Sequence, residues 1–102
     1  MLELRPCCEC CEAPLPADAS NAMICSFECT FCVECVETHL DNVCPNCGGG
    51  FTARPIRPKH DWVNGNCVTH YPASTERVVK PVDPLVQQLL VTRLAGKLPE
   101  QR

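Results

Sequence analysis

Eleven cysteines occur among the 102 residues, and most of them form pairs with the spacing of metal ligands. In a C-x2-C pair, one tight turn (a knuckle) presents two sulfurs to the same ion, and the backbone amides of the turn can hydrogen-bond those sulfurs. The chain has three such pairs and a fourth that is one residue wider: Cys8/Cys11, Cys32/Cys35, Cys44/Cys47 and Cys25/Cys29. Because Zn²⁺ takes four ligands in a tetrahedron, these eight sulfurs predict two structural zinc ions per chain.

Disulfide bonds are the competing use of so many thiols. The first residues, "MLELRPCCEC", contain no apolar run, no basic leader and no cleavage site, so we expect no secretory signal and a cytoplasmic protein. Thiols stay reduced in the cytoplasm, and an odd number of cysteines fits a closed disulfide framework poorly. No stretch is long and apolar enough to predict a membrane helix. Clustered cysteines are therefore expected to bind metal.

The eight sulfurs can be shared between two ions in two ways. Sequential wiring joins the first pair along the chain to the second, and the third pair to the fourth. Interleaved wiring gives the first zinc Cys8, Cys11, Cys32 and Cys35, and it gives the second zinc Cys25, Cys29, Cys44 and Cys47. The expected pattern of strands and helix favours the interleaved arrangement.

Short elements must position these sulfurs. Residues 23–27 and 30–31 are expected to form two strands around a turn, a short β-hairpin with Phe27 and Phe31 in the core. A helical pattern then begins at Cys35 and runs through "CVETHL", with two apolar residues four positions apart that can face the core, Val36 and Leu40. The sequence thus predicts a small metal-stabilised α+β domain.

The composition changes after the last cysteine pair, and this divides the chain into three parts. Residues 1–51 are expected to form the two-zinc domain. Residues 52–61 are rich in proline, which favours extended geometry, so they are predicted to be a linker. Residues 62–102 form an extension whose last part is predicted to be helical over about 84–95.

The predicted C-terminal helix has clear boundaries. Asp83 can cap its first turn, Pro84 suits the first helical position, and Gly96 follows its end. The helix is amphipathic, and we expect its apolar stripe to pack as ordinary core. The alternative is a homodimer contact or another partner surface. The stripe consists of Leu85, Val86, Leu89, Leu90 and Leu94.

Several remaining residues have chemistry of their own. Cys67 with His60, Asp61 and His70 could make a third metal site or a cysteine–histidine nucleophile pair. The expected reading is simpler, with Cys67 as a small buried residue and exposed histidines. His39 is expected to be a solvated helix residue, with zinc ligation in place of a cysteine as the alternative.

The net charge of −3 argues against binding to nucleic acid. A zinc held by four thiolates makes the protein still more acidic. Arg54, Arg57 and Lys59 form a small basic patch between prolines, but no aromatic side chains alternate with them. We expect this patch to be solvated linker.

The segment "CTFCVECVETHLDNVCPNC" resembles the second half of a RING finger, a cross-brace zinc domain. In that pattern a ligand is followed by x2-C-x2-C, a helix and C-P-x-C. Cys29 stands where a RING finger often has histidine, and Cys25 departs from the pattern because three residues separate it from Cys29 instead of one. The resemblance implies a RING-like or treble-clef-like two-zinc module.

The first 58 residues more closely resemble a bacterial family of short, cysteine-rich proteins of unknown function. The shared pattern runs "LELRPCCECC…LP…AMICSFECTFCVECVE…L…CPNCGG". This resemblance implies that Cys8 and Cys11 are the ligands of the first knuckle. By spacing alone, Cys7 and Cys10 could replace them, since they form a second C-x2-C pair one residue earlier; otherwise they are spare thiols.

The expected function is structural and not enzymatic. A zinc closed by four thiolates has no open position for water, and the cysteine half contains no acid–base pair, phosphate loop or nucleophile constellation. We expect a small zinc-scaffolded adaptor that binds another protein. The alternatives are a RING-like module that recruits a ubiquitin-type conjugating enzyme, a thiol and zinc redox sensor, and a nucleic-acid-binding protein of the zinc-ribbon kind. RING ligases generally place an apolar residue inside the first knuckle, where this chain has Glu9 and Cys10.

Overall fold

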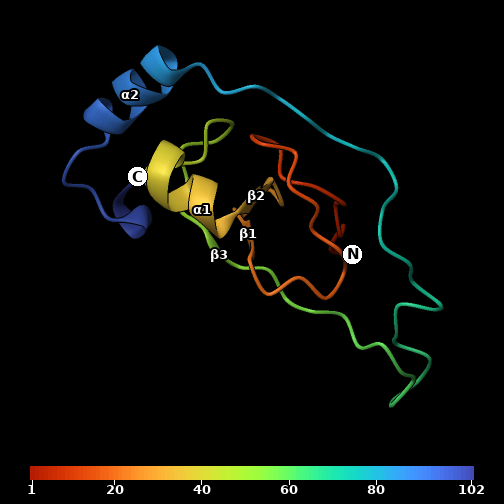
Figure 1. Ribbon diagram of the computed structural model, residues 1–102. Helices are drawn as coiled ribbons and strands as arrows, with labels where there is room; N and C mark the ends of the chain where they lie inside the picture. Colours follow the sequence, from red (N-terminus) through yellow and green to blue (C-terminus); the bar gives the residue numbers. More distant parts are fainter.

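The computed structural model describes all residues from 1 to 102. A small sheet and one short helical segment lie at the centre, and the second half of the chain passes around them as a long loop before it reaches the C-terminal helix (Figure 1). The molecule extends 45 × 26 × 18 Å. The elements, in chain order, are β1 (Ala22–Ile24), β2 (Thr30–Cys32), α1 (Val33–Cys35), η1 (Val36–Leu40), β3 (Thr52–Ala53), α2 (Pro84–Arg93) and η2 (Pro99–Gln101).

The sheet has three antiparallel strands in the order β2-β1-β3. The predicted hairpin is present as β1 and β2, with Met23 opposite Phe31, but its first strand ends at Ile24, three residues before the predicted end. β3 was not predicted, because its two residues lie at the start of the expected linker. Arg54, which follows β3, is also buried. The packed domain therefore continues past residue 51, and the proline-rich segment begins inside it.

A single helical segment follows β2 without a break. It begins at Val33, two residues before the predicted start at Cys35. Its second part, η1, is a π-helical turn that ends where the Asp41 amide donates to the carbonyl of Val36. Val36 and Leu40 are buried, as their spacing predicts.

Sulfur and a few large side chains fill the core. Only 20 of the 102 residues are buried, which is a thin core that needs additional stabilisation. Phe31 is buried and meets Phe51 edge to face, with ring centroids 5.4 Å apart. The prediction that Phe27 belongs to the core is wrong, because this side chain is 72% exposed.

The extension returns to the N-terminal segment and runs beside it. We call residues 72–82 the strap. The amide of Ser74 donates to the carbonyl of Leu4 (3.0 Å), and the amide of Lys80 donates to the carbonyl of Glu9 (2.9 Å). Because the residue numbers increase in the same direction along both segments, the strap and the N-terminal segment run parallel to each other. Val82, at the end of the strap, packs against the core cluster.

Helix α2 has the predicted N-terminal cap, but it ends at Arg93, two residues before the predicted end, and its packing differs from the prediction. The Asp83 carboxylate accepts from the first amides of the helix, and Pro84 is the first helical residue. Its buried residue is the polar Gln87, whose side-chain amide donates to the carbonyls of Leu40 (3.0 Å) and Val43 (2.9 Å). Most of the apolar residues that were expected to form core are exposed to solvent, and the most exposed side chains are Leu85, Val86 and Leu89. No helix of the structure is long and apolar enough to cross a membrane.

Candidate metal centres

Four sulfurs that are far apart in the sequence converge on one point, which we call the first centre. Each of them lies within 4.8 Å of the other three: Cys8, Cys11, Cys32 and Cys35. The sulfurs of Cys11 and Cys32 are 3.7 Å apart. Tetrahedral coordination with Zn–S bonds near ~2.3 Å requires a sulfur–sulfur separation of about 3.8 Å. The number of sulfurs therefore fits a zinc ion, and so does the distance between these two.

Local structure explains how the first centre forms. A tight turn carries Cys8 and Cys11, and the amides of Cys10 and Cys11 point at the Cys8 sulfur at 3.4 and 3.5 Å. The other two sulfurs come from the end of β2 and from α1, so that Cys32 and Cys35 are joined by the first helical turn. Amides aimed at a sulfur favour the thiolate, which is the form that binds metal.

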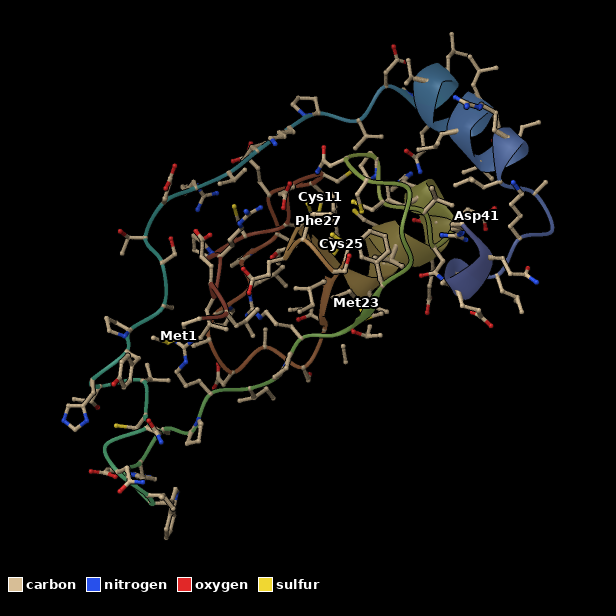
Figure 2. All side chains as sticks on the ribbon, turned by 180° about the vertical axis from the view of Figure 1, so that it is seen from behind. Met1, Cys11, Met23, Cys25, Phe27 and Asp41 are labelled. Atoms are coloured by element: carbon tan, nitrogen blue, oxygen red, sulfur yellow. The ribbon has the colours of Figure 1, made fainter.

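A second group of sulfurs, the second centre, contains Cys25, Cys44 and Cys47, all within 4.8 Å of one another. Each of these sulfurs accepts a backbone amide: from Phe27 at 3.3 Å, from Asn46 at 3.4 Å and from Gly49 at 3.4 Å, respectively. This is the same knuckle geometry as in the first centre. Figure 2 shows Cys25 and Cys11 in the sulfur-rich middle of the molecule, between the sheet and the N-terminal loop.

Cys29, the predicted fourth ligand of the second centre, lies beside this group, but its sulfur is more than 4.8 Å from at least one of the three other sulfurs. Its thiol contacts Cys25 and the side chain of Asn46, and the residue is buried. The C-x3-C loop from Cys25 to Cys29 contains a left-handed residue, Glu28, with φ of 66°. The structure therefore brings three of the four predicted sulfurs together and places the fourth next to them.

The grouping of the sulfurs is that of the interleaved arrangement. Sequential wiring would require Cys25 beside Cys8, but these residues belong to different groups. Cys7 lies outside both centres and forms an isolated β-bridge with Pro14. Cys10 is half-buried with its thiol in contact with Cys35, again outside the first centre. None of the eleven cysteines forms a disulfide bond.

Burial affects the protonation of two of the clustered cysteines. It raises the pKa of the Cys35 thiol far above the usual range, and contacts with Cys32 and Cys11 add to this. Burial likewise raises the pKa of the Cys44 thiol. At neutral pH both groups hold their protons unless a cation replaces them. Metal binding at these positions therefore releases protons.

Cys67 and the nearby histidines do not form a third centre. The Cys67 sulfur lies 3.6 Å from Nδ1 of His70, but the same nitrogen lies 2.9 Å from the carbonyl oxygen of Gly65. A carbonyl oxygen only accepts, so Nδ1 carries the hydrogen and cannot act as a base or a metal ligand there. Cys67 is buried, while His60 stacks edge to face on Trp62. His39 is exposed and belongs to neither cysteine group.

The expectation that the three basic residues of this segment are solvated linker is wrong for Arg54 and Arg57. Arg54 is buried, with its guanidinium donating to the backbone carbonyls of Arg5, Leu15 and Pro16. Arg57 donates to the carbonyls of Leu2 and Tyr71 and so fastens the extension to the N-terminus. These side chains hold the fold together, which leaves Lys59 as the one exposed cation of the three.

Sequence reasoning gave no structural role to one residue of the first knuckle, Glu9. Its side chain is fully buried and accepts hydrogen bonds from Thr30 of β2 and from Asn46, which lies between Cys44 and Cys47. The sequence does contain a signal, since Glu9 stands where RING ligases generally have an apolar residue, but the sequence alone does not show its partners.

Fold and sulfur groups together define a small, cysteine-rich α+β protein with two cysteine clusters able to bind metal ions. The profile of a protein family of unknown function, DUF1272, matches residues 1–57, and the chain belongs to this family. An uncharacterized protein of Rhizobium meliloti (strain 1021) is 56% identical over 81 residues, which cover 79% of this chain and 89% of that protein. Similarity to this relative therefore extends beyond the part that the family profile matches. No solved structure matches the chain.

Proposed function

We propose that the protein is a non-catalytic scaffold stabilised by two structural Zn²⁺ ions. The observation that carries this proposal is the convergence of four cysteine sulfurs in the first centre, all within 4.8 Å of one another and two of them 3.7 Å apart. In the second centre, Cys29 would complete the set formed by Cys25, Cys44 and Cys47. Four thiolates leave no open position for water, so each ion would serve the fold and not a reaction.

Elemental analysis combined with native mass spectrometry tests the metal assignment. We expect two zinc ions in each chain. Cys8→Ser should remove one ion, whereas the matched change Cys7→Ser should leave both, because Cys7 lies outside the centres. Recovery of metal-free protein under reducing conditions, or of iron in place of zinc, would overturn the assignment. The same spectra report whether the chain forms homodimers.

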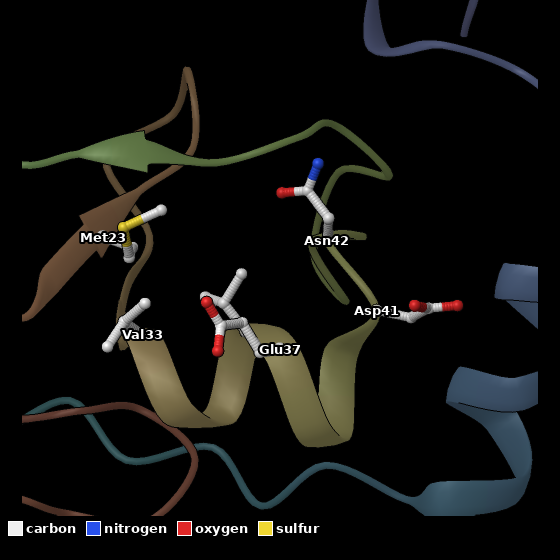
Figure 3. A pocket seen from close by; sticks show the side chains of 6 residues that line it. Met23, Val33, Glu37, Asp41 and Asn42 are labelled. Atoms are coloured by element: carbon white, nitrogen blue, oxygen red, sulfur yellow. The ribbon is translucent and has the colours of Figure 1, made fainter.

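The scaffold presents a groove that suits a partner protein. Its volume is about 370 Å³, and it lies between β1 and the helical segment (Figure 3). Three apolar side chains line it, together with two carboxylates and one amide: Met23, Val33, Val36, Glu37, Asp41 and Asn42. Neither carboxylate has a cationic partner within the chain. The adaptor function we propose is to bind a protein segment that combines an apolar side chain with Lys or Arg.

Selection from a random peptide library against the metal-loaded protein tests this adaptor function. Enriched peptides should carry an apolar residue close to a basic one. Their affinity should fall with Glu37→Lys and remain with Glu34→Lys, a matched change on the same helical segment but outside the groove. Peptides that lack basic residues, or that bind both variants equally, would contradict the proposed partner.

A further inference from the structure

Glu9 is the one acidic side chain that is completely buried. It follows Cys8 directly and therefore sits inside the first knuckle. A buried carboxylate is costly unless several donors satisfy it. One donor is Arg5, whose guanidinium lies 2.7 Å from Oε2 and neutralises the charge. The remaining donors come from distant parts of the chain.

The first remote partner is Thr30, which Glu9 holds through two hydrogen bonds. The Thr30 amide donates to Oε2 of Glu9 at 2.6 Å, and the Glu9 amide donates to the Thr30 carbonyl at 3.0 Å. Thr30 is fully buried and lies between Cys29 and Cys32. This contact therefore fixes the first knuckle against the strand that joins the two cysteine groups.

The second remote partner is Asn46, which lies inside the "CPNC" knuckle of the second centre. Its side-chain amide donates to Oε1 of Glu9 at 3.4 Å. The backbone amide of Asn46 points at the Cys44 sulfur, and its side chain contacts the thiol of Cys29. Glu9 thus connects a knuckle of the first centre with a knuckle of the second. Both of its oxygens are engaged by donors, so it is not itself a metal ligand.

We propose that Glu9 couples the two centres, so that metal in one raises the affinity of the other for metal. This inference rests on the proposed two-metal function. A metal ion in the first centre fixes the Cys8–Cys11 knuckle and with it the Glu9 carboxylate. The carboxylate then holds Asn46, and with it the knuckle of the second centre, in the arrangement that binds metal. When either knuckle is unfixed, the buried carboxylate loses donors, and this penalty disfavours molecules with a single ion. Such coupling is reciprocal by thermodynamic necessity.

Titration of reduced, metal-free protein with substoichiometric Zn²⁺, followed by native mass spectrometry, measures the coupling directly. The spectra count chains that hold no ion, one ion or two ions. Independent sites would give the binomial distribution, whereas coupled sites deplete the one-ion species. We expect depletion in the natural sequence. We expect Glu9→Gln to lower the ratio of the second to the first binding constant by about fivefold or more, the range of typical allosteric couplings.

Two further variants make the result decisive. Glu12→Gln is the matched control, because Glu12 is exposed and pairs only with Arg77; it should leave the distribution unchanged. Asn46→Ala removes the link to the second knuckle but keeps Arg5 and Thr30, so it tests the coupling even if Glu9→Gln does not fold. Unchanged one-ion fractions in Glu9→Gln and Asn46→Ala would overturn the coupling, while a natural protein that binds no metal would overturn the two-zinc function instead.

Discussion

Cysteine side chains fill the interior of this protein to an unusual degree. Six of the twelve residues of its main core cluster are cysteines. A thiol contributes less apolar surface than a leucine or phenylalanine, so the few large side chains matter more than they would in a larger domain. Phe31 is the largest fully buried one, and it packs against Phe51.

Phe31→Ala should lower the free energy of unfolding by about 3–5 kcal/mol, because it leaves a cavity beside Phe51. Phe27→Ala is the matched control: its ring is 72% exposed, so the change should be within about 0.5 kcal/mol. Denaturant unfolding of the metal-loaded variants measures both values. Equal losses in the two variants would mean that Phe27 is packed after all.

The two phenylalanines also show what a sequence can and cannot reveal about single residues. Both flank the same hairpin turn and are equally apolar, so pattern reasoning placed both in the core. Phe27 lies inside the loop from Cys25 to Cys29, where its amide donates to the Cys25 sulfur and the next residue, Glu28, is left-handed, so it does not continue the strand. The pairs of cysteines could be predicted from spacing, because ligand geometry is strict, but the choice between the two groupings needed the expected pattern of strands and helix. The burial of Glu9 depended on three-dimensional partners that no spacing shows.

At the scale of elements, helix α2 is attached by polar contacts instead of an apolar face. The side chain of Gln87 donates to two carbonyls just beyond η1, at Leu40 and Val43. The carbonyl of Val43 has no other partner among the hydrogen bonds of the structure. Gln87 therefore satisfies the end of the helical segment that carries Cys35, one of the four sulfurs of the first centre.

Gln87→Ala should release α2 from the domain, because it leaves a buried carbonyl unsatisfied at a cost of about 1–3 kcal/mol. The expected readout is faster amide hydrogen exchange throughout α2. Gln88→Ala changes a neighbouring exposed glutamine and should not alter that exchange. Faster exchange in both variants, or in neither, would show that other contacts attach the helix.

Elements differed in how well the sequence predicted them. The start of α2 was predicted, because Asp83 and Pro84 act locally through capping and backbone preference, whereas the helix ends at Arg93, two residues before the predicted end. The face that α2 buries was not predicted, since burial of Gln87 depends on carbonyls more than forty residues away in the sequence. β3 was missed for a similar reason: its two residues pair with β1, and a two-residue strand has no periodicity to detect.

At the scale of the whole molecule, one continuous set of contacts joins both halves of the chain. The strap runs beside the N-terminal segment, and Arg57 fastens the extension to the carbonyl of Leu2. These contacts presuppose an ordered N-terminal knuckle. A structural zinc supplies roughly 10–16 kcal/mol of apparent binding free energy, which is as large as the whole net stability of typical domains, about 5–15 kcal/mol. Order in the extension should therefore depend on metal in the cysteine-rich half.

Removal of metal by a strong chelator should unfold the cysteine-rich half and free the strap. Circular dichroism and thermal melting, before and after restoration of Zn²⁺, measure this. Release should become easier as the pH falls from neutral to about 5, because burial raises the pKa of the Cys35 and Cys44 thiols and protons then compete with the metal. A metal-free protein with an unchanged spectrum and melting curve would contradict this dependence on metal.

The π-helical turn η1 has a consequence for aligning this chain with its relatives. A π turn closes its hydrogen bond over one residue more than an α turn, so it accommodates a single extra residue without moving what precedes and follows it. We expect relatives with one residue fewer between Cys35 and Cys44 to show a gap at η1, an ordinary α-helix there and the same two cysteine groups. A difference of one residue between Cys35 and Cys44 would then reflect a change from a π-helical to an α-helical turn, with both cysteine groups retained.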